Sequence, residues 1–342
     1  MSEHSLWESL KTIAFLAEYD ALPGYGEEKR PAHACGHNWV AAASVVAALL
    51  LSRVEGWQGT VVVLGTPAEE TVGGKVILAK NGAFLGSDAA FEMHLNKCNS
   101  LRPHAIAIDS WEFSFRGKAS HAAAAPERGI NALDAVNLTF AGISALRQQL
   151  KPDVRIHGIV TDGGAAVNVI PESAACRFYV RSEKREYLNE VSRRVIDCAR
   201  GAALMTGAEL VVRQFENSYD DLEPNAVLME RMAVHLERAG FGEVETAKQE
   251  PGSTDLGTVS HLVPVFYGYA GVGDGCTDCH EADFIPLADS PQAAEQAVRC
   301  ALAMACGAAE LLTNRKLLSE VKAAFLGGTS QQVCEAPAAS RR

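Results

Sequence analysis

The sequence predicts an α/β protein with a second, α+β domain inserted into it. Residues 59–67 form a near-continuous β-branched run, GTVVVLGTP, which is typical of a strand buried on both faces of a parallel sheet. Residues 106–217 follow the order strand, helix, strand, strand, helix, strand, which is the split βαβ pattern of a ferredoxin-like domain. With 342 residues, 48% of them hydrophobic, the chain is long enough for two cores.

The first domain is expected at residues 1–105 and 218–327, the inserted domain at 106–217, and a disordered tail at 328–342. In the first domain we expect strands at 12–19, 59–67, 87–95 and 263–269, helices at 38–53, 73–84, 224–239 and 290–312, and an exposed loop at 24–34. In the inserted domain we expect strands at 106–116, 154–161, 174–181 and 209–214, and helices at 131–150 and 186–205.

Composition and charge exclude several classes of protein. The formal net charge of −11 and the pI near 5.4 oppose binding to a phosphate backbone, so nucleic acid is not expected as a partner. The longest apolar stretch, residues 40–51, is shorter than the roughly 18 residues that a membrane span needs. Glu3 and Glu8 precede the first apolar run, which is unlike a secretory signal. Nine cysteines, an odd number, indicate reduced thiols, so we expect a cytoplasmic protein.

The stretch HACGHN, residues 33–38, contains a thiol and an imidazole two residues apart. Cys35 and His37 are both ligands for a borderline-soft divalent metal, and Gly36 between them lets the backbone turn so that both point inward. The stretch lies at the start of a predicted helix, whose dipole favours the thiolate. A Cys-x-His pair by itself is more often a buried thiol beside a hydrogen-bonded histidine.

Further metal-competent residues follow two predicted strands. Glu69 and Glu70 come directly after the buried strand at 59–67, and His94 lies at the end of the next strand. The carboxyl edge of an open α/β sheet is where such sheets keep their sites. An exposed acidic pair that caps the following helix is the other interpretation of Glu69 and Glu70.

Together these residues and one later histidine make a candidate metal set: Cys35, His37, Glu70, His94 and His280. Five ligands are too many for one tetrahedral site with an open position, but they suit two metals that share a bridging water. Glu69, beside a ligand, is placed to take a proton from that water. The donor set allows zinc, manganese or cobalt.

Seven ordered motifs carry a resemblance to a known family. They are EYDALPG (18–24), HACGHN, GTPAEE (65–70), Met93 with His94, GKASHAAAAPERGINALDA (117–135), DGGAAVNVIPE (162–172) and GSTDLGTVSH (252–261). From about residue 12 to 312 the chain resembles the aminoacylase and hippurate hydrolase family of dimetal amidohydrolases. Within that family it is most similar to the branch of p-aminobenzoyl-glutamate hydrolase and the β-alanyl-lysine type dipeptidases.

The resemblance implies roles for individual residues. The five metal-set residues match the family's ligands, and Glu69 matches its catalytic acid/base. Asp20 matches an acidic residue that orients a ligand or the metal-binding loop. His121 matches a histidine that polarises the scissile carbonyl, typically from the partner subunit of a dimer. Asn168 and Arg181 match residues that bind the substrate carboxylate.

The resemblance also implies the overall architecture and activity. It implies a mixed-sheet catalytic domain flanked by helices, an inserted lid that forms a homodimer, two divalent metals, and hydrolysis of an N-acyl amino acid, aminobenzoyl-glutamate or small dipeptide.

Three departures from the family pattern stand out. Only about eleven residues precede the first strand, residues 25–32 are longer than in the shortest family members, and Cys276 and Cys279 form a Cys-x-x-Cys before His280. The last feature fits either redox modulation or two free thiols. The short segment before the first strand leaves a second hypothesis open, namely a truncated, catalytically weak metal-binding or dimerisation homologue.

Overall fold

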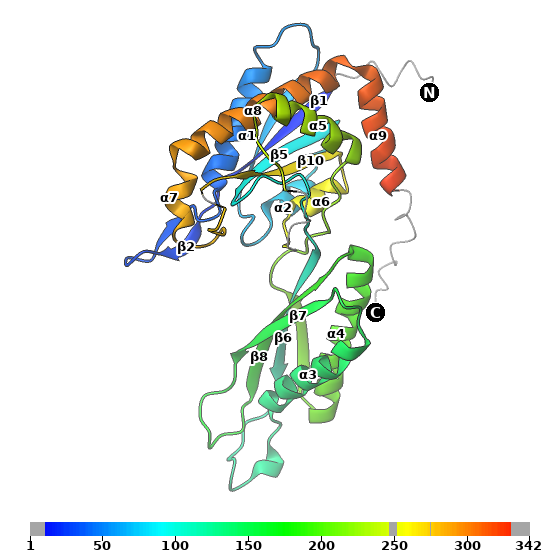
Figure 1. Ribbon diagram of the computed structural model, residues 1–342. Helices are drawn as coiled ribbons and strands as arrows, with labels where there is room; N and C mark the ends of the chain where they lie inside the picture. Colours follow the sequence, from blue (N-terminus) through cyan, green and yellow to red (C-terminus); the bar gives the residue numbers. More distant parts are fainter. Residues whose placement is uncertain (1–10, 246–251, 274, 330–342) are drawn as a thin grey trace. The chain divides into compact units, whose positions relative to one another are not determined.

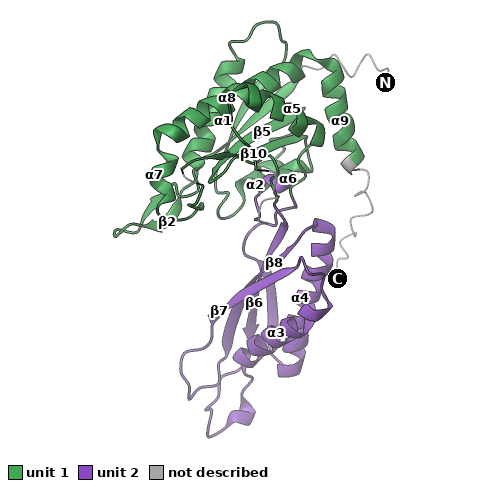
Figure 2. Ribbon diagram, in the orientation of Figure 1, with its two compact units in different colours: residues 1–104, 222–250, 258–342 green, residues 105–221, 251–257 purple. Residues whose placement is uncertain are grey.

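The computed structural model describes residues 11–245, 252–273 and 275–329 of the chain. They fall into two compact units (Figure 2). Unit 1 contains the described residues of 1–104, 222–250 and 258–342, and unit 2 those of 105–221 and 251–257. Unit 2 therefore interrupts unit 1 in the sequence.

A four-stranded parallel sheet forms the centre of unit 1. Its strands are β1 (Thr12–Glu18), β4 (Thr60–Thr66), β5 (Ala89–Asn96) and β10 (Val265–Gly271), in the order β10-β5-β1-β4. Each of the three neighbouring pairs is parallel. Antiparallel pairing in unit 1 occurs at the isolated bridge between Ser100 and Tyr269 of β10 and in the small hairpin described below.

Four helices share the hydrophobic core on one face of this sheet (Figure 1). They are α1 (His37–Leu51), α5 (Ala226–Arg238), α8 (Pro291–Thr313) and α9 (Arg315–Thr329). Because side chains alternate along a strand, Phe15 and Phe91 point into this hydrophobic core. The alternate positions, Glu18 and His94 among them, belong to the opposite face. There the short helix α2 (Gly74–Lys80) contributes the buried Lys75.

Several local predictions for unit 1 need correction. The run at 59–67 forms β4, but β4 is not buried on both faces, because among the described residues it pairs only with β1 and Val63 is 40% exposed. The expected loop at 24–34 contains an antiparallel hairpin, β2 (Leu22–Tyr25) with β3 (Arg30–Ala32). Two short helices, α6 (Leu256–Ser260) and α7 (Phe284–Ala288), were not anticipated.

Helix α9 was also missed. It runs to Thr329, two residues into the predicted tail, and Leu317 and Val321 pack in the core. The rest of the predicted tail, residues 330–342, lies outside the described residues.

Unit 2 has the expected order of elements. They are β6 (Ala107–Arg116), α3 (Ala132–Leu146), β7 (Arg155–Asp162), β8 (Ser173–Ser182), α4 (Arg185–Thr206) and β9 (Glu209–Gln214), with 3₁₀ turns at Pro126–Arg128 and Arg147–Gln149. The strands form an antiparallel sheet in the order β7-β8-β6-β9, which is the ferredoxin-like arrangement. Helices α3 and α4 share its core.

In the described part of the chain, every helix falls short of the combination of length and apolar character that crossing a membrane requires.

Candidate metal centre

The candidate ligands gather at the carboxyl end of the parallel sheet of unit 1. His94 is on β5, Glu70 follows β4, and Cys35 and His37 lie at the start of α1, which packs on β1. Parallel strands deliver the residues at their carboxyl ends to one edge of the sheet, which explains why residues distant in sequence meet here.

Gly36 sets the positions of Cys35 and His37. It is the N-cap of α1 and has a φ of 76°, in the left-handed region that favours glycine. A Cβ atom at Gly36 would lie 3.1 Å from the Cβ of Leu95. A glycine is therefore required here both by conformation and by the close approach of β5.

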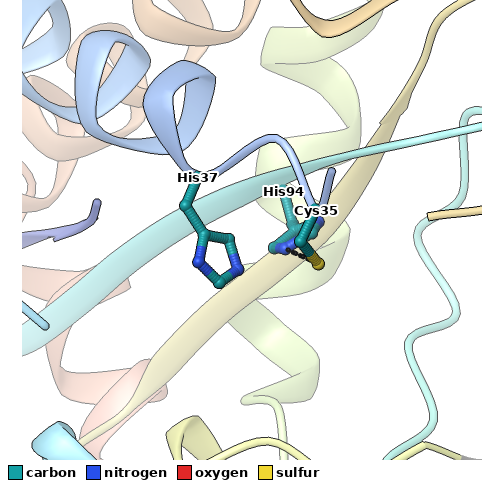
Figure 3. Close-up of side chains that lie close together, drawn as sticks. All are labelled: Cys35, His37 and His94. Carbon is teal, nitrogen blue, oxygen red and sulfur yellow. Dashed lines mark hydrogen bonds between the residues drawn. The ribbon is translucent and has the colours of Figure 1, made fainter. Parts of the chain in front are cut away.

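Two groups of three donor atoms share one sulfur. Cys35, His37 and His94 form one group, and Cys35, Glu70 and His280 form the other, with the donor atoms of each group within 4.8 Å of one another. Figure 3 shows the first group, in which Cys35 Sγ lies 3.7 Å from His94 Nε2. Glu69 lies alongside, because its carboxylate forms a third such group with His37 and Glu70.

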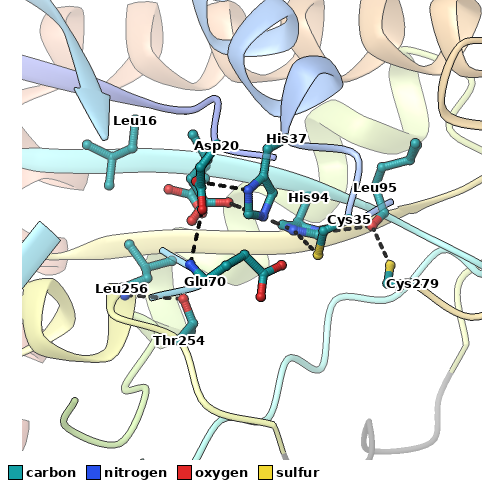
Figure 4. Close-up of polar contacts among 12 residues, drawn as sticks. Leu16, Asp20, Cys35, His37, Glu70, His94, Leu95, Thr254, Leu256 and Cys279 are labelled. Carbon is teal, nitrogen blue, oxygen red and sulfur yellow. Dashed lines mark hydrogen bonds and ion pairs between the residues drawn. The ribbon is translucent and has the colours of Figure 1, made fainter. Parts of the chain in front are cut away.

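Asp20 holds two of the ligands in place (Figure 4). Its Oδ1 lies 3.0 Å from His37 Nδ1, and its Oδ2 accepts a hydrogen bond from the Glu70 backbone N–H at 3.1 Å. Burial opposes the charge, but these hydrogen bonds lower the pKa of Asp20 to about 2. Against the effect of burial, Asp20 and Glu18 raise the pKa of His37 to about 9, so the surroundings of this ring favour a positive charge.

His280 approaches Glu70 from a strained backbone position. Its Nε2 lies 3.0 Å from Glu70 Oε1, and its φ is 74°, which is rare for a residue with a side chain. The position is fixed because the His280 N–H donates to Ala34 O at 2.8 Å and its carbonyl accepts from Tyr25 Oη at 2.8 Å. Ala68, directly before Glu69, has a φ of 62°. Two strained residues thus flank the same site.

Within the Cys-x-x-Cys, Cys279 interacts with Cys35. Cys279 also donates to Leu95 O at 3.6 Å. We expected the helix dipole to favour the Cys35 thiolate, but the hydrogen bond with Cys279, together with burial, raises the pKa of the Cys35 thiol well above its usual value. Binding of a divalent ion would have to displace this proton.

The sequence analysis did not single out Glu18 or Lys75. Glu18 ends β1, is 1% exposed, and makes an ion pair with the fully buried Lys75. Burial alone would raise the pKa of Glu18, but Lys75 and two neighbouring histidines lower it to about 2. The only signal in the sequence was that Glu18 stands two residues before Asp20, so both point to the same side of an extended chain.

The donor set fits a dinuclear metal centre. It offers a thiolate, imidazole nitrogens and carboxylates, the ligands that zinc and related divalent ions prefer. His37 Nε2 is buried and has no hydrogen-bond partner among the described residues, as expected for a nitrogen that binds a cation.

In unit 2, backbone pairing places His121 beside the segment of Asn168. Ala122 N–H donates to Asn168 O at 3.0 Å, and His121 forms an isolated bridge with Val169. The Nδ1 of His121 accepts hydrogen bonds from the N–H groups of Ala123 and Ala124, at 3.2 and 3.1 Å. A neutral His121 therefore carries its proton on Nε2, and this side chain is exposed.

Arg181 lies near the end of β8, where its side chain is partly buried. Its Nη1 donates to Ser253 Oγ at 3.1 Å, and the guanidinium lies 5.7 Å from the centre of the Tyr179 ring. Burial lowers the pKa of Arg181. Its Nε is buried without a hydrogen-bond partner among the described residues, so the guanidinium has donor capacity to spare.

The structure does not bring Asn168 and Arg181 together within one chain. Asn168 is in the loop before β8, whose first residue is Ser173, whereas Arg181 is eight positions further along that strand (181 − 173). At about 3.4 Å per residue, the strand separates the two by roughly 27 Å. The expectation that both bind one carboxylate stays a prediction, and with this spacing it calls for residues of two copies of the chain.

Comparison with known proteins agrees with this geometry. Residues 14–303 match the family model described as Peptidase family M20/M25/M40, and the chain belongs to this family of amide-bond hydrolases. The Xaa-Arg dipeptidase of Mus musculus is 36% identical over 321 residues, which is 92% of this chain and 73% of that protein. One of the p-aminobenzoyl-glutamate hydrolase subunits of Escherichia coli is 31% identical, over 70% of this chain and 53% of that protein.

Solved structures show the same fold. A putative aminohydrolase from methicillin-resistant Staphylococcus aureus superposes with a TM-score of 0.67 at 23% identity, covering 86% of this chain and 82% of that one. A dinuclear metal-binding peptidase of the M20 family from Bacillus subtilis superposes with a TM-score of 0.60 at 22% identity, covering 86% and 83%.

Proposed function

We propose that this protein uses two divalent metal ions to hydrolyse the amide bond of a small dipeptide or N-acyl amino acid, including aminobenzoyl-glutamate. The observation that carries the proposal is the pair of three-donor groups that share Cys35, with the Glu69 carboxylate beside them. When bound, the ions would supply Lewis acidity and lower the pKa of an attacking water to about 7.

The chain's own residues would supply the remaining chemistry. Glu69 would take the proton from the attacking water and pass it to the leaving amine, because its carboxylate lies within 4.8 Å of donor atoms of His37 and Glu70. His121 would donate a hydrogen bond from Nε2 to the scissile carbonyl, since its Nδ1 is occupied as an acceptor. Arg181 would bind the substrate carboxylate with its unused donors.

The positions of these groups in unit 2 support a homodimer. If His121, Asn168 and Arg181 all act on one small substrate, a strand length of roughly 27 Å between them requires contributions from two copies of the chain. We therefore propose that His121 and Asn168 act in the site of the partner subunit, whereas Arg181 acts in the site of its own subunit. Unit 2 would then be both the lid and the dimerisation domain.

The relatives suggest the substrates to test first. Their names include Xaa-Arg dipeptidase, p-aminobenzoyl-glutamate hydrolase and N-acetylcysteine deacetylase. In all three names the scissile amide joins an amino acid that carries a carboxylate. The guanidinium of Arg181 is suited to bind that carboxylate. Zinc or manganese is the proposed metal, with cobalt as a further option. The cytoplasm is the proposed location, since the exposed thiol of Cys306 is free and suits a reducing compartment.

A metal-removal experiment tests the proposal. The full chain is dialysed against a chelator, reloaded separately with Zn²⁺, Mn²⁺ or Co²⁺, and analysed for metal content. Each sample is then assayed on Xaa-Arg dipeptides, β-alanyl-lysine, p-aminobenzoyl-glutamate and N-acetylcysteine. We expect two ions per chain, with hydrolysis lost on chelation and restored on reloading.

The alternative is a metal-binding or dimerisation homologue without activity. Two bound ions and no turnover of any amide in the panel would favour that alternative. The names of the relatives do not favour this alternative, because they describe hydrolases.

A further inference from the structure

Glu18 points an unsatisfied carboxylate oxygen at the two histidines of one donor group. Its Oε2 lies 3.3 Å from His37 Nε2 and 3.8 Å from His94 Nε2. Both Glu18 Oε2 and His37 Nε2 are buried, and neither has a hydrogen-bond partner among the described residues. The other oxygen, Oε1, is bound by the Lys75 ammonium. Lys75 therefore fixes the carboxylate with one oxygen turned toward the histidines.

The contacts of Nδ1 in the two rings fix what each Nε2 presents to Glu18 when the rings are neutral, as metal binding requires. His37 Nδ1 is 3.0 Å from the Asp20 carboxylate, and His94 Nδ1 is 2.7 Å from Leu95 O, so in each neutral ring Nδ1 carries the proton. Each Nε2 then presents a lone pair. In that state two lone-pair nitrogens and a carboxylate oxygen face one another inside the protein, and a bound metal ion would take the place of the His37 proton between them.

The distances suit donors that share one ion. Two nitrogen or oxygen donors at 2.0–2.1 Å from a tetrahedral zinc lie about 3.3 Å apart, and a nitrogen and a sulfur donor about 3.5 Å apart. The separation of Glu18 Oε2 from His37 Nε2 is 3.3 Å, and that of Cys35 Sγ from His94 Nε2 is 3.7 Å. Glu18 Oε2 lies 3.8 Å from His94 Nε2, so the carboxylate would have to move toward His94 on binding the ion.

We propose that Glu18 is a metal ligand, and that it closes the site of Cys35, His37 and His94 with a fourth protein donor. The site of Cys35, Glu70 and His280 has three protein donors and would keep an open position for water or substrate, next to Glu69. This inference rests on the dinuclear centre of the proposed function.

A pair of buried carboxylates on neighbouring strands supplies the experiment and its control. Glu92 on β5 also faces Lys75, at 3.9 Å, and is fully buried. Glu18→Gln and Glu92→Gln each remove one charge from the surroundings of Lys75, but only Glu18→Gln removes an oxygen ligand. Metal per chain is measured after equilibration of the full-length proteins with a series of buffered free-Zn²⁺ concentrations, and thermal melting shows whether each variant is folded.

We expect two ions per chain in the wild type and in Glu92→Gln, and a 10- to 100-fold loss of affinity at one of the two sites in Glu18→Gln. Equal affinity at both sites in a folded Glu18→Gln protein would overturn the inference. If Glu18→Gln does not fold, a crystal structure of zinc-loaded wild type decides the question. There, Glu18 Oε2 should lie about 2.0–2.2 Å from the ion bound by His37 and His94, and a distance above about 3 Å would rule it out as a ligand.

The outcomes separate this inference from the proposed function. A wild type that binds two ions through Glu18 and the other ligands but hydrolyses no amide refutes only the proposed function. A wild type that binds no ion refutes both.

Discussion

Glu69 and Glu70 are adjacent in sequence, but the structure gives them different surroundings. Glu70 Oε1 lies 3.0 Å from His280 Nε2, and the backbone N–H of Glu70 donates to Asp20. Although burial opposes its charge, the hydrogen bond with His280 lowers the pKa of Glu70, as suits a ligand carboxylate. The φ of 62° at Ala68 turns the chain just before the pair. Strain at this point is consistent with a functional requirement on the direction of both side chains.

Replacing each carboxylate separately should distinguish proton transfer from metal binding. We expect Glu69→Gln to lower kcat by at least about 10²-fold while two ions remain bound, because only a proton-transfer group is lost. The measurements are steady-state hydrolysis and metal content. Glu70→Gln is the matched control, and it should lose metal as well as activity. A Glu69→Gln protein with normal turnover would exclude the proposed role.

At the scale of residues, the sequence was most informative where the chemistry of a residue was unusual. Cys35, His37, Glu70, His94 and His280 could be proposed from residue type and from position after predicted strands, and the structure gathers them. Glu18 and Lys75 could not. A glutamate at a strand end and a lysine at a helix start are ordinarily solvated. Their burial depends on which strands lie beside β1, which local sequence does not reveal.

At the scale of elements, the start of α2 determines how the Glu69-Glu70 turn is held. Gly73 N–H donates to Ala68 O at 2.9 Å, which closes the turn before the helix. Gly74 comes so close to Pro67 that a Cβ atom would lie 1.7 Å from the Pro67 carbonyl oxygen. Any side chain at position 74 must therefore displace the backbone on which Glu69 and Glu70 depend.

We expect Gly74→Ala to destabilise the protein by about 1–3 kcal/mol, as overpacking does, and to weaken metal binding. Gly201→Ala is the control, because Gly201 lies within α4 and a Cβ atom there meets nothing within 4 Å. That change should be neutral or stabilising by up to about 1 kcal/mol. Denaturant unfolding and metal titration measure both effects. Equal stability of the two variants would show that the turn tolerates a shift.

The elements that the sequence predicted well are long apolar runs in the core. Strands β1 and β5 are buried along nearly their whole length, and helices α1 and α8 pack on the same core. The hairpin β2-β3 was missed because most of its residues are exposed and carry no alternation. The burial of β4 was overestimated because a β-branched run looks the same at the edge of a sheet as at its centre.

At the scale of the whole molecule, the sheet of unit 2 separates His121 from Arg181. A complementation experiment tests whether two chains cooperate. Glu69→Ala and His121→Ala should each be inactive alone. If His121 acts on the partner's site, a mixed dimer contains one site with both residues intact, so activity should return to about a quarter of wild type after random subunit exchange between equal amounts of the two variants.

Two inactive variants in which both changes fall on the same side of the site, Glu69→Ala and Glu70→Ala, serve as the control and should not complement. Absence of recovered activity after proven exchange between Glu69→Ala and His121→Ala chains would contradict the sharing of sites. The separation along β8 that prompts this experiment was not visible in the sequence, where Asn168 and Arg181 are only 13 positions apart (181 − 168).

The outer edge of β4 has a practical consequence for handling the protein. Among the described residues β4 pairs on one side only, and a strand edge of this kind is a template for association with another polypeptide. The formal charge of −11 keeps copies apart by repulsion at pH 7, but this repulsion vanishes near the pI of about 5.4. Concentrated samples should therefore stay clear when buffered well above that pH and become turbid close to it.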